Sequence, residues 1–232
     1  MNVPQHVTII MDGNGRWARK QGQQRLFGHN EGVESVRACT EFAARAGVKY
    51  LSIFAFSEEN WSRSEAEVAG LMTLMFKSVL GERETFRRNH IRFRVIGNRA
   101  KLPSGLLEQI DMVEKETEEN DGMQLIVMLS YSGKWDIVQA ASRYAADVAS
   151  GKVSGGLTED VFAGYLATAG IPDPDLMIRT SGELRISNYM LWQCAYTEFY
   201  FTDTLWPDFR KEEFAAALEA YSSRDRRYGK IK

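Results

Sequence analysis

Residues 6–18 read HVTIIMDGNGRWA, in which an apolar run passes directly into a polar, glycine-rich segment. The run at 7–11 is short and rich in β-branched residues, which predicts a strand buried on both faces. Such strands belong to parallel sheets, and these sheets bind ligands outside the carboxyl ends of their strands. The segment at 12–16 therefore occupies a position at which a binding site is expected.

Strand and helix signals alternate along the rest of the chain. Further strands are expected at residues 48–56, 91–96, 124–131, 176–178 and 195–201. Helices are expected at 33–47, 64–80, 103–121, 135–149, 158–169 and 210–221, the second opening with a Ser64–Glu67 capping box. The best linker candidate, 151–156, is a short loop. We therefore predict one α/β domain, residues 1–232, built on a central, mostly parallel six-stranded sheet flanked by helices.

The composition is that of a globular protein without a strong net charge. The 232 residues are 44% hydrophobic and 26% charged, with a formal net charge of -2. These proportions exclude disordered, collagenous and coiled-coil chains, and they do not favour broad nucleic-acid binding. Cys39 and Cys194 are too few for a disulfide framework or a metal knuckle. The first residues do not read as a leader, and no apolar run approaches the ~18 residues of a membrane span, so a cytoplasmic protein is expected.

The segment at 12–16 has the composition of a phosphate site. Gly13 and Gly15 allow backbone N–H groups to approach an anion closely, and Arg16 adds a bidentate donor. Asp12 would repel a phosphate unless a cation such as Mg2+ lay between them. The combination indicates a metal–diphosphate site.

Other interpretations of this segment remain open. Glycines also serve simple strand-to-helix turns. Residues 13–18 match the dinucleotide-binding pattern G-x-G-x-x-A, although the acid expected about 20 residues later is displaced here. An EF-hand loop is excluded, because Arg16 and Trp17 occupy the positions at which that loop needs an oxygen ligand and a glycine.

Polar segments at 57–63 and 179–188 follow two later strands. His29 lies near the start of the first long helix, although a lone histidine is more often structural than catalytic. Several arginines are expected at the carboxyl ends of the strands, where together they could bind more than one diphosphate. They are Arg16, Arg25, Arg63, Arg179 and Arg185.

The helix at 64–80 carries an unusually wide apolar face. Ala69 and Gly70 near its start would leave room for a groove, with core packing as the alternative. Beside an anion-binding mouth, such a groove would suit a ligand with a charged head and an apolar tail.

Several blocks of sequence resemble the cis-prenyltransferase family, of the bacterial undecaprenyl diphosphate synthase type. They are HVTIIMDGNGRWA (6–18), RLFGH (25–29), FAFSEENWSR (54–63), YSGKWDIV (131–138), MIRTSGELRISNYMLWQ (177–193) and AYTEFYFTDTLWPDF (195–209). Residues 224–229 resemble the basic C-terminal signature of the family. The sequence contains no DDxxD pair, which trans-prenyltransferases use for their Mg2+ clusters.

The resemblance implies a Mg2+-dependent enzyme that adds isopentenyl diphosphate repeatedly to an allylic diphosphate such as farnesyl diphosphate. The implied product is a long Z-polyprenyl diphosphate, with undecaprenyl diphosphate, a cell-wall carrier lipid, as the family default. A non-catalytic, prenyltransferase-like partner subunit is the alternative, but such a protein should have lost the arginines that are present here. A nucleotide-binding oxidoreductase is a third alternative, which binding of a nicotinamide or flavin cofactor would support.

The resemblance also assigns roles to residues. Asp12 is implied to bind the metal and to be essential for catalysis, with Glu198 as a second metal-site carboxylate. Asn60 stands where the family has its proton acceptor; a neutral amide is a poor base, so it either takes the proton or orients a diphosphate oxygen or water that does so. The residues implied to bind substrate are Gly13, Asn14, Gly15, Arg16, Trp17, Arg25, His29, Ser57, Glu58, Glu59, Trp61, Arg63, Arg179, Arg185, Ile186 and Ser187. The helix at 64–80 would line the tunnel for the growing chain.

Three positions depart from the family pattern. Leu184 stands where relatives often have a polar residue such as histidine, Ser64 replaces a common proline, and Ser130 replaces a common asparagine.

Family members are generally homodimers, and the aromatic segment at 196–209 is either interface or core. Basic residues near the C-terminus would bind diphosphate, rest on anionic lipid at the inner membrane face during product release, or form a solvated tail; they are Arg224, Arg226, Arg227, Lys230 and Lys232.

Overall fold

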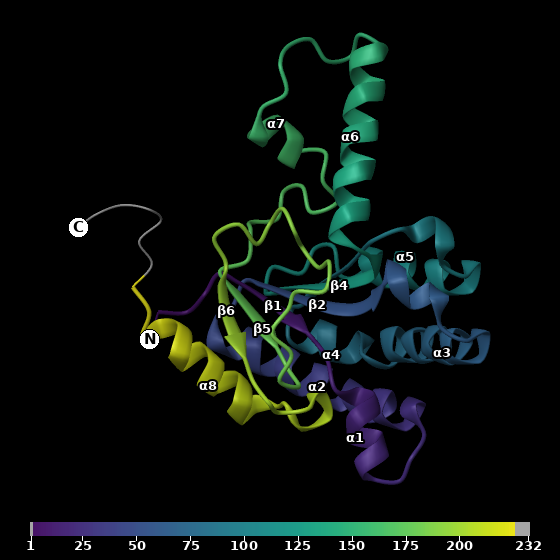
Figure 1. The fold of residues 1–232 in the computed structure, drawn as a ribbon, viewed down its shortest axis with the longest axis vertical. Coiled ribbons are helices and arrows are strands. Elements are labelled where there is room, and N and C mark those ends of the chain that lie inside the picture. The colour runs from purple at the N-terminus through teal and green to yellow at the C-terminus, as the bar shows by residue number, and fades with distance from the viewer. Residues whose placement is uncertain (1, 226–232) are drawn as a thin grey trace.

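The apolar runs predicted as strands form one parallel sheet in the computed structural model, which describes residues 2–225 (Figure 1). The strands are β1 (His6–Ile10), β2 (Tyr50–Ser57), β3 (Arg92–Ile96), β4 (Gln124–Tyr131), β5 (Leu176–Arg179) and β6 (Glu198–Phe201). They lie in the order β3-β4-β2-β1-β5-β6, and every pair is parallel. The predicted α/β class with a six-stranded sheet is therefore confirmed.

Helices connect the strands and cover the sheet. They are α1 (Asn14–Lys20), α2 (Arg25–Ala46), α3 (Glu65–Gly81), α4 (Arg83–Arg88), α5 (Ser104–Glu116), α6 (Gly133–Ala149), α7 (Glu159–Ala163) and α8 (Lys211–Ser222), with a 3-10 helix η1 (Glu58–Ser62) after β2. Half of the predicted capping box of α3 is present, because the Ser64 hydroxyl accepts a hydrogen bond from the N–H of Glu67 at 3.4 Å. The Glu67 carboxylate instead pairs with Arg25 and Arg63. Helices α6 and α7 project away from the sheet (Figure 1).

Successive side chains of β1 point to opposite faces of the sheet. Val7 and Ile9 are fully buried in a cluster shared with α2, α3, α5 and α8. Ile10 belongs to a second cluster, with Tyr189 and Met190 from the segment after β5. Both faces of β1 are covered, as its continuous apolar run predicts.

Some elements differ from their predicted bounds. The helix predicted at 158–169 ends at Ala163, because the chain turns after Gly164. The strand predicted at 195–201 begins at Glu198, because residues 191–196 form turns. Helix α4 was not predicted; only six residues long, it carries too short a pattern to be recognised.

Side chains at the end of α5 accept hydrogen bonds from the free N–H groups of the edge strand β3. Thr117 Oγ1 accepts a hydrogen bond from the N–H of Phe93 at 3.1 Å, and Glu114 Oε1 accepts one from the N–H of Val95 at 2.7 Å. Edge N–H groups that are already bonded cannot recruit a further strand. Helix α5 stops at Glu116, short of the predicted 121, and this end places Thr117 against β3.

His6 opens β1 and is completely buried. Its Nδ1–H donates to the carbonyl of Pro172 at 2.6 Å, so its Nε2 accepts a hydrogen bond from the Ser52 hydroxyl at 2.7 Å. Burial lowers the pKa of His6 from 6.5 to about 4, because a charged ring would lose its hydration. The folded protein therefore holds this ring in its neutral form.

Acid should destabilise the fold through His6. Between pH 6.5 and about 4 the unfolded chain binds a proton that the folded protein excludes. The stability contributed by the neutral ring is complete above pH 6.5 and falls with pH, by about 2 kcal/mol at pH 5. Urea unfolding at pH 7 and pH 5 measures this loss. The variant His6→Asn keeps a donor for Pro172 but has no ring that titrates, so its free energy of unfolding should fall less between pH 7 and pH 5. An equal fall in both proteins would contradict a neutral, buried His6 as the cause.

Candidate active site

Three polar segments meet beyond the carboxyl ends of β1, β2 and β5. Strand β1 lies between the other two, with Ile10 opposite Phe54 on one side and Arg179 on the other. The segments at 12–16 and 179–188 therefore lie next to each other, and the segment after β2 lies on the other side of β1. This edge is where parallel sheets bind ligands.

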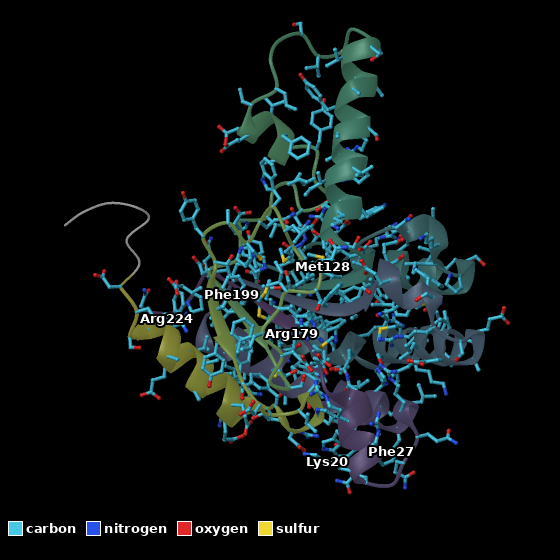
Figure 2. The ribbon with its side chains drawn as sticks, in the orientation of Figure 1. Lys20, Phe27, Met128, Arg179, Phe199 and Arg224 are labelled. Atoms are coloured by element: carbon cyan, nitrogen blue, oxygen red, sulfur yellow. The ribbon has the colours of Figure 1, made fainter. Side chains whose placement is uncertain are left out.

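Arg179, the last residue of β5, places its side chain near the middle of the molecule, where it is only 3% exposed (Figure 2). Its Nη2 donates to Asp12 Oδ2 at 2.9 Å, and its Nη1 donates to Ser187 Oγ at 2.6 Å and to the Arg185 carbonyl. The buried Nε–H finds no acceptor among residues 2–225. This Nε has almost no accessible surface, so it lies inside the wall of the site, and the guanidinium meets its surroundings through its two Nη atoms.

Asp12 is held through both its backbone and its carboxylate. Its N–H donates to the Thr180 hydroxyl at 2.9 Å, and that hydroxyl donates to the Asp12 carbonyl at 2.6 Å. Burial alone would raise the pKa of Asp12, but the hydrogen bond and charge of Arg179, with the charge of Arg16, hold the pKa below its usual value. The carboxylate is therefore ionised at neutral pH and can bind a cation.

The two glycines after Asp12 are required by space and by conformation. Gly13 has a φ of +112°, and a Cβ there would lie 3.0 Å from atoms of Leu205. At Gly15 a Cβ would lie 3.1 Å from the side chain of Arg25. The glycine loop thus lets α1 and α2 approach each other beside the site.

Carboxylates hold the arginines on the β5 side of the site. Arg16 donates a hydrogen bond to the Ser181 hydroxyl and lies 3.2 Å from Glu183. Arg185, which is exposed, pairs with the same carboxylate at 2.5 Å. Phosphate oxygens could replace Glu183 as the partner of both guanidinium groups, because they offer the same bidentate geometry.

A second basic group lies at the start of α2 and after η1. Glu67 pairs with Arg25 at 3.4 Å and with Arg63 at 3.0 Å. Burial and the charge of Arg25 lower the pKa of Arg63. Burial, with these two arginines, also lowers the pKa of His29, whose Nδ1–H donates to the Arg25 carbonyl at 3.0 Å. His29 is therefore neutral and keeps Nε2 as an acceptor.

Asn60 is oriented by its own turn. Its Oδ1 accepts a hydrogen bond from the N–H of Ser57 at 3.1 Å. The amide NH2 is then the group that can donate a hydrogen bond to a ligand, because the oxygen already accepts one from Ser57. This orientation suits a hydrogen-bond donor to an anion better than a base.

These residues surround a cavity of about 240 Å³, which we call the head cavity. The predicted site residues on its wall are Asp12, Asn14, His29, Ser57, Asn60, Arg63, Arg179 and Ser187. The Asn14 Oδ1 is buried and has no partner among the described residues. The head cavity thus joins groups from all three segments.

A second, apolar cavity of about 80 Å³, the deep cavity, continues from the first between α2, α3 and the sheet. Both cavities are lined by Met11, Val33, Val36, Ala55 and Met75. The molecule therefore offers a polar mouth above an apolar pocket, as the sequence indicates.

The other predicted substrate-binding residues do not line the head cavity. They are Gly13, Gly15, Arg16, Trp17, Arg25, Glu58, Glu59, Trp61, Arg185 and Ile186. Several of them support the wall instead. Ser130, at a φ of +54°, accepts a hydrogen bond from Trp61 Nε1 at 2.8 Å and donates one to Glu58 at 2.6 Å. Asn188 donates to Glu59 at 2.6 Å and so ties the segment at 57–63 to the one at 179–188.

Glu198 does not lie beside Asp12. It opens β6 opposite Leu176, at the amino ends of the strands, whereas Asp12 lies beyond their carboxyl ends. Its carboxylate accepts a hydrogen bond from Arg224 at 2.9 Å, and Figure 2 shows Arg224 well away from Arg179. Within one chain, Glu198 and Asp12 therefore lie at opposite ends of the strands and do not reach the same ion, and a role of Glu198 as a second metal-site carboxylate stays a prediction.

The groove expected at Ala69 and Gly70 is not the apolar cavity of the site. Ala69 is exposed and lines a separate outer groove of about 650 Å³ between α3 and α5. Gly70 faces α2, where a Cβ would lie 3.2 Å from Leu26. The rest of α3 does line the site, through Leu71, Leu74 and Met75 in the head cavity.

Thr180 and Ala55 belong to the site but were not predicted. A hydroxyl directly after a strand was a usable signal for Thr180. Ala55 carried no signal, because an apolar residue in a buried strand reads the same whether it faces the core or a cavity.

Two further expectations concern the ends of the chain and the membrane. Arg226, Arg227, Lys230 and Lys232 lie outside the described residues. Within residues 2–225, no helix has both the length and the apolar character needed to cross a bilayer.

Comparison with known proteins identifies the family of the chain. Residues 10–229 match the family described as putative undecaprenyl diphosphate synthase. An isoprenyl transferase of Geobacter sulfurreducens is 49% identical over 98% of this chain and 93% of its own. A ditrans,polycis-undecaprenyl-diphosphate synthase ((2E,6E)-farnesyl-diphosphate specific) of Aliivibrio fischeri is 46% identical over 98% of this chain and 89% of its own.

Solved structures agree as well. Lavandulyl diphosphate synthase from Lavandula x intermedia, in complex with dimethylallyl diphosphate, has a TM-score of 0.96 at 37% identity and covers 98% of this chain and 99% of its own. A probable undecaprenyl diphosphate synthase from Campylobacter jejuni has a TM-score of 0.82 at 32% identity over 99% of this chain and 100% of its own. The chain thus belongs to the undecaprenyl diphosphate synthase family of isoprenyl transferases, the cis-prenyltransferases.

Proposed function

We propose that this protein adds isopentenyl diphosphate units repeatedly to farnesyl diphosphate and releases undecaprenyl diphosphate, a carrier lipid for cell-wall synthesis. The observation that carries the proposal is the buried Arg179, bonded to Asp12, in the wall of a polar cavity that adjoins an apolar one. The names of the relatives at 45–49% identity support the substrate and the product. A diphosphate head and a prenyl tail match this division of polar and apolar surface.

Two basic groups would hold two diphosphates. Arg179, Arg185 and Ser187 would bind isopentenyl diphosphate, with Ile186 and the Arg16 guanidinium beside them. Residues of the glycine loop, with Arg25 and His29, would bind the allylic diphosphate. In each group a carboxylate already pairs with arginines, and this supports their assignment as partners of an anion.

The donor set fits Mg2+ that enters together with a diphosphate. Asp12 is ionised and partly exposed, and the described residues contain no group of three His, Cys, Asp or Glu side chains that could hold a metal by themselves. Mg2+ is commonly bound through one or two carboxylates and the phosphates of a substrate. When bound, Mg2+ would stabilise the negative charge that develops on the departing diphosphate.

The condensation breaks the allylic C–O bond, forms a C–C bond to the isopentenyl unit and releases one proton. Arginine side chains would stabilise the leaving diphosphate, and the apolar wall would keep water from the allylic carbon as positive charge develops. The NH2 of Asn60 would orient a diphosphate oxygen, so that this oxygen or a bound water takes the proton. Neutral His29 would accept a hydrogen bond from such a water through Nε2.

The growing chain would enter the deep cavity between α2 and α3. Its volume of about 80 Å³ cannot hold many isoprene units, so the two helices would have to separate as the chain lengthens. Two ion pairs join the helices, Arg25–Glu67 near their start and Arg37–Glu82 at the end of α3. The residues between these pairs are mostly apolar, and this favours such a separation.

We further propose a cytoplasmic homodimer in which residues 1–232 form one domain. The edge strand β6 supports this proposal, because Phe201 and nearby Tyr196 are 37% and 70% exposed. Leu205, Trp206 and Phe209 of the same aromatic segment are buried in the core. The segment would thus serve both core and interface, with transient contact to the inner membrane face during product release.

Replacing Asp12 by asparagine should abolish most of the activity. The variant Asp12→Asn keeps an oxygen for Arg179 but loses the charge that binds the cation, so kcat/KM should fall by about 100-fold or more. Steady-state incorporation of labelled isopentenyl diphosphate measures the loss. Exposed Asp160 on α7 provides a control, Asp160→Asn, which should retain full activity. Full Mg2+-dependent activity in Asp12→Asn would refute the assigned role.

Enlarging Ala55 should shorten the product. A leucine at this position would narrow the connection between the head cavity and the deep cavity, since Ala55 lines both. The variant Ala55→Leu should therefore accumulate short polyprenyl diphosphates, which chromatography of the labelled products resolves. Ala69→Leu, on the outer groove, should keep the unmodified product length. The assignment of the tunnel fails if Ala69→Leu shortens the product and Ala55→Leu does not.

A further inference from the structure

The turn that carries Asn60 is held from outside the head cavity. Asn60 lies in η1 (Glu58–Ser62), a 3-10 helix of five residues. The hydrogen bonds of such a short 3-10 helix have poor geometry, so contacts with neighbouring elements must fix its position. Glu58 and Trp61, the first and fourth residues of η1, do not line the head cavity, and both bond to Ser130 near the end of β4.

Ser130 is completely buried, and its hydroxyl both accepts and donates. Its Oγ accepts a hydrogen bond from Trp61 Nε1 at 2.8 Å and donates one to Glu58 Oε1 at 2.6 Å. A hydroxyl has a single proton to donate. Because this proton points to the carboxylate, a lone pair of the oxygen remains for the indole. The hydrogen bond that holds Trp61 therefore depends on the carboxylate of Glu58.

The backbone of Ser130 also indicates that its side chain matters. Its φ is +54°, in the left-handed region, which glycine and asparagine adopt more readily than serine. A residue that keeps an unfavourable backbone conformation points to a role for its side chain. Here that role is to join the indole of Trp61 to the carboxylate of Glu58.

Lys101 reaches the same carboxylate from the other side of β4. Strands β3, β4 and β2 are neighbours in the sheet, so the segments after them lie side by side. The segment after β3 contains Lys101, in the 3-10 helix η2 (Arg99–Lys101), and its Asn98 N–H donates to the Ser130 carbonyl at 2.9 Å. The Lys101 ammonium donates to Glu58 Oε2, whereas Ser130 donates to Oε1. The Glu58 side chain is only 16% exposed, so this ion pair compensates a charge that has lost most of its hydration.

We infer that Lys101 is a positioning residue for the condensation, which acts through Glu58 and Ser130 on the turn that carries Asn60. The inference rests on the proposed function, in which the Asn60 amide orients a diphosphate oxygen. Lys101 does not line the head cavity; its ammonium orients the carboxylate that in turn orients the Ser130 hydroxyl. Misplacing a group beside the reacting atoms by about 1 Å can cost about 100-fold in rate, so the effect should appear in kcat more than in KM.

Removal of the lysine charge tests this connection at its outer end. The variant Lys101→Met keeps the length of the side chain but cannot donate to Glu58, whereas Lys101→Arg keeps a cation. With Mg2+, farnesyl diphosphate and labelled isopentenyl diphosphate, Lys101→Met should lower kcat about tenfold and change KM for either substrate by less than about threefold. Lys101→Arg should restore most of the lost kcat. Lys152 pairs with Asp147 of the projecting helix α6, so Lys152→Met provides a matched control that should keep its kcat (Figure 1).

The variant Ser130→Gly tests the middle of the connection without straining the backbone. Glycine adopts a φ of +54° readily, so this variant removes the hydroxyl and should still fold, as circular dichroism can verify. Its kcat should fall at least as far as that of Lys101→Met, because Trp61 and Glu58 both lose a partner. Exposed His90 has a φ of +52°, and the control His90→Gly should keep the kcat of the unmodified protein.

A double-mutant cycle separates positioning of Asn60 from a general loss of structure. In a protein that already carries Asn60→Ala, Lys101→Met should lower the residual kcat by less than about twofold, because the amide that it positions is gone. A merely structural role would lower kcat equally in both backgrounds, and that result would overturn the inference.

The outcomes distinguish this inference from the proposed function. If the unmodified protein elongates farnesyl diphosphate while Lys101→Met and Ser130→Gly both keep its kcat, the positioning role alone fails. Equal losses in Lys152→Met or His90→Gly also overturn it. If the unmodified protein incorporates no isopentenyl diphosphate, the proposed function fails and the positioning role fails with it.

Discussion

The burial of the Arg179 guanidinium is the constraint on which the site depends. A cation that is 3% exposed must be compensated, and Asp12, Ser187 and the Arg185 carbonyl do so from two different segments. The same contacts that satisfy the charge fix the loop after β5 against the loop after β1.

The deep cavity places a second demand on the fold, because a prenyl chain needs an apolar wall. This wall consists mainly of aliphatic and aromatic residues of α2, α3, α4 and the sheet. Both this cavity and the head cavity are lined by Met11, Val33, Val36, Ala55 and Met75, so the polar and the apolar space adjoin.

Much of the fold could be predicted from the sequence, because short apolar runs bounded by polar segments, such as 124–131, are typical of strands buried on both faces. The site was predicted less completely. The residues after β1 and β5 were found because parallel register places them together, as Asp12 and Arg179 show. The place of Glu198 at the amino end of β6 could not be predicted, because a family motif does not tell at which end of a strand a residue lies. Ala69 was misplaced because a helix that is apolar on most sides does not reveal which side faces the cavity.

The most direct test is incubation of the unmodified protein with farnesyl diphosphate and labelled isopentenyl diphosphate, with and without Mg2+, followed by separation of the products by length. The expected result is a long Z-polyprenyl diphosphate that forms only with Mg2+, because Asp12 and the arginines need the cation to hold two diphosphates together. Absence of any labelled product with farnesyl diphosphate, and with every other allylic primer, would contradict the assignment and favour a non-catalytic subunit.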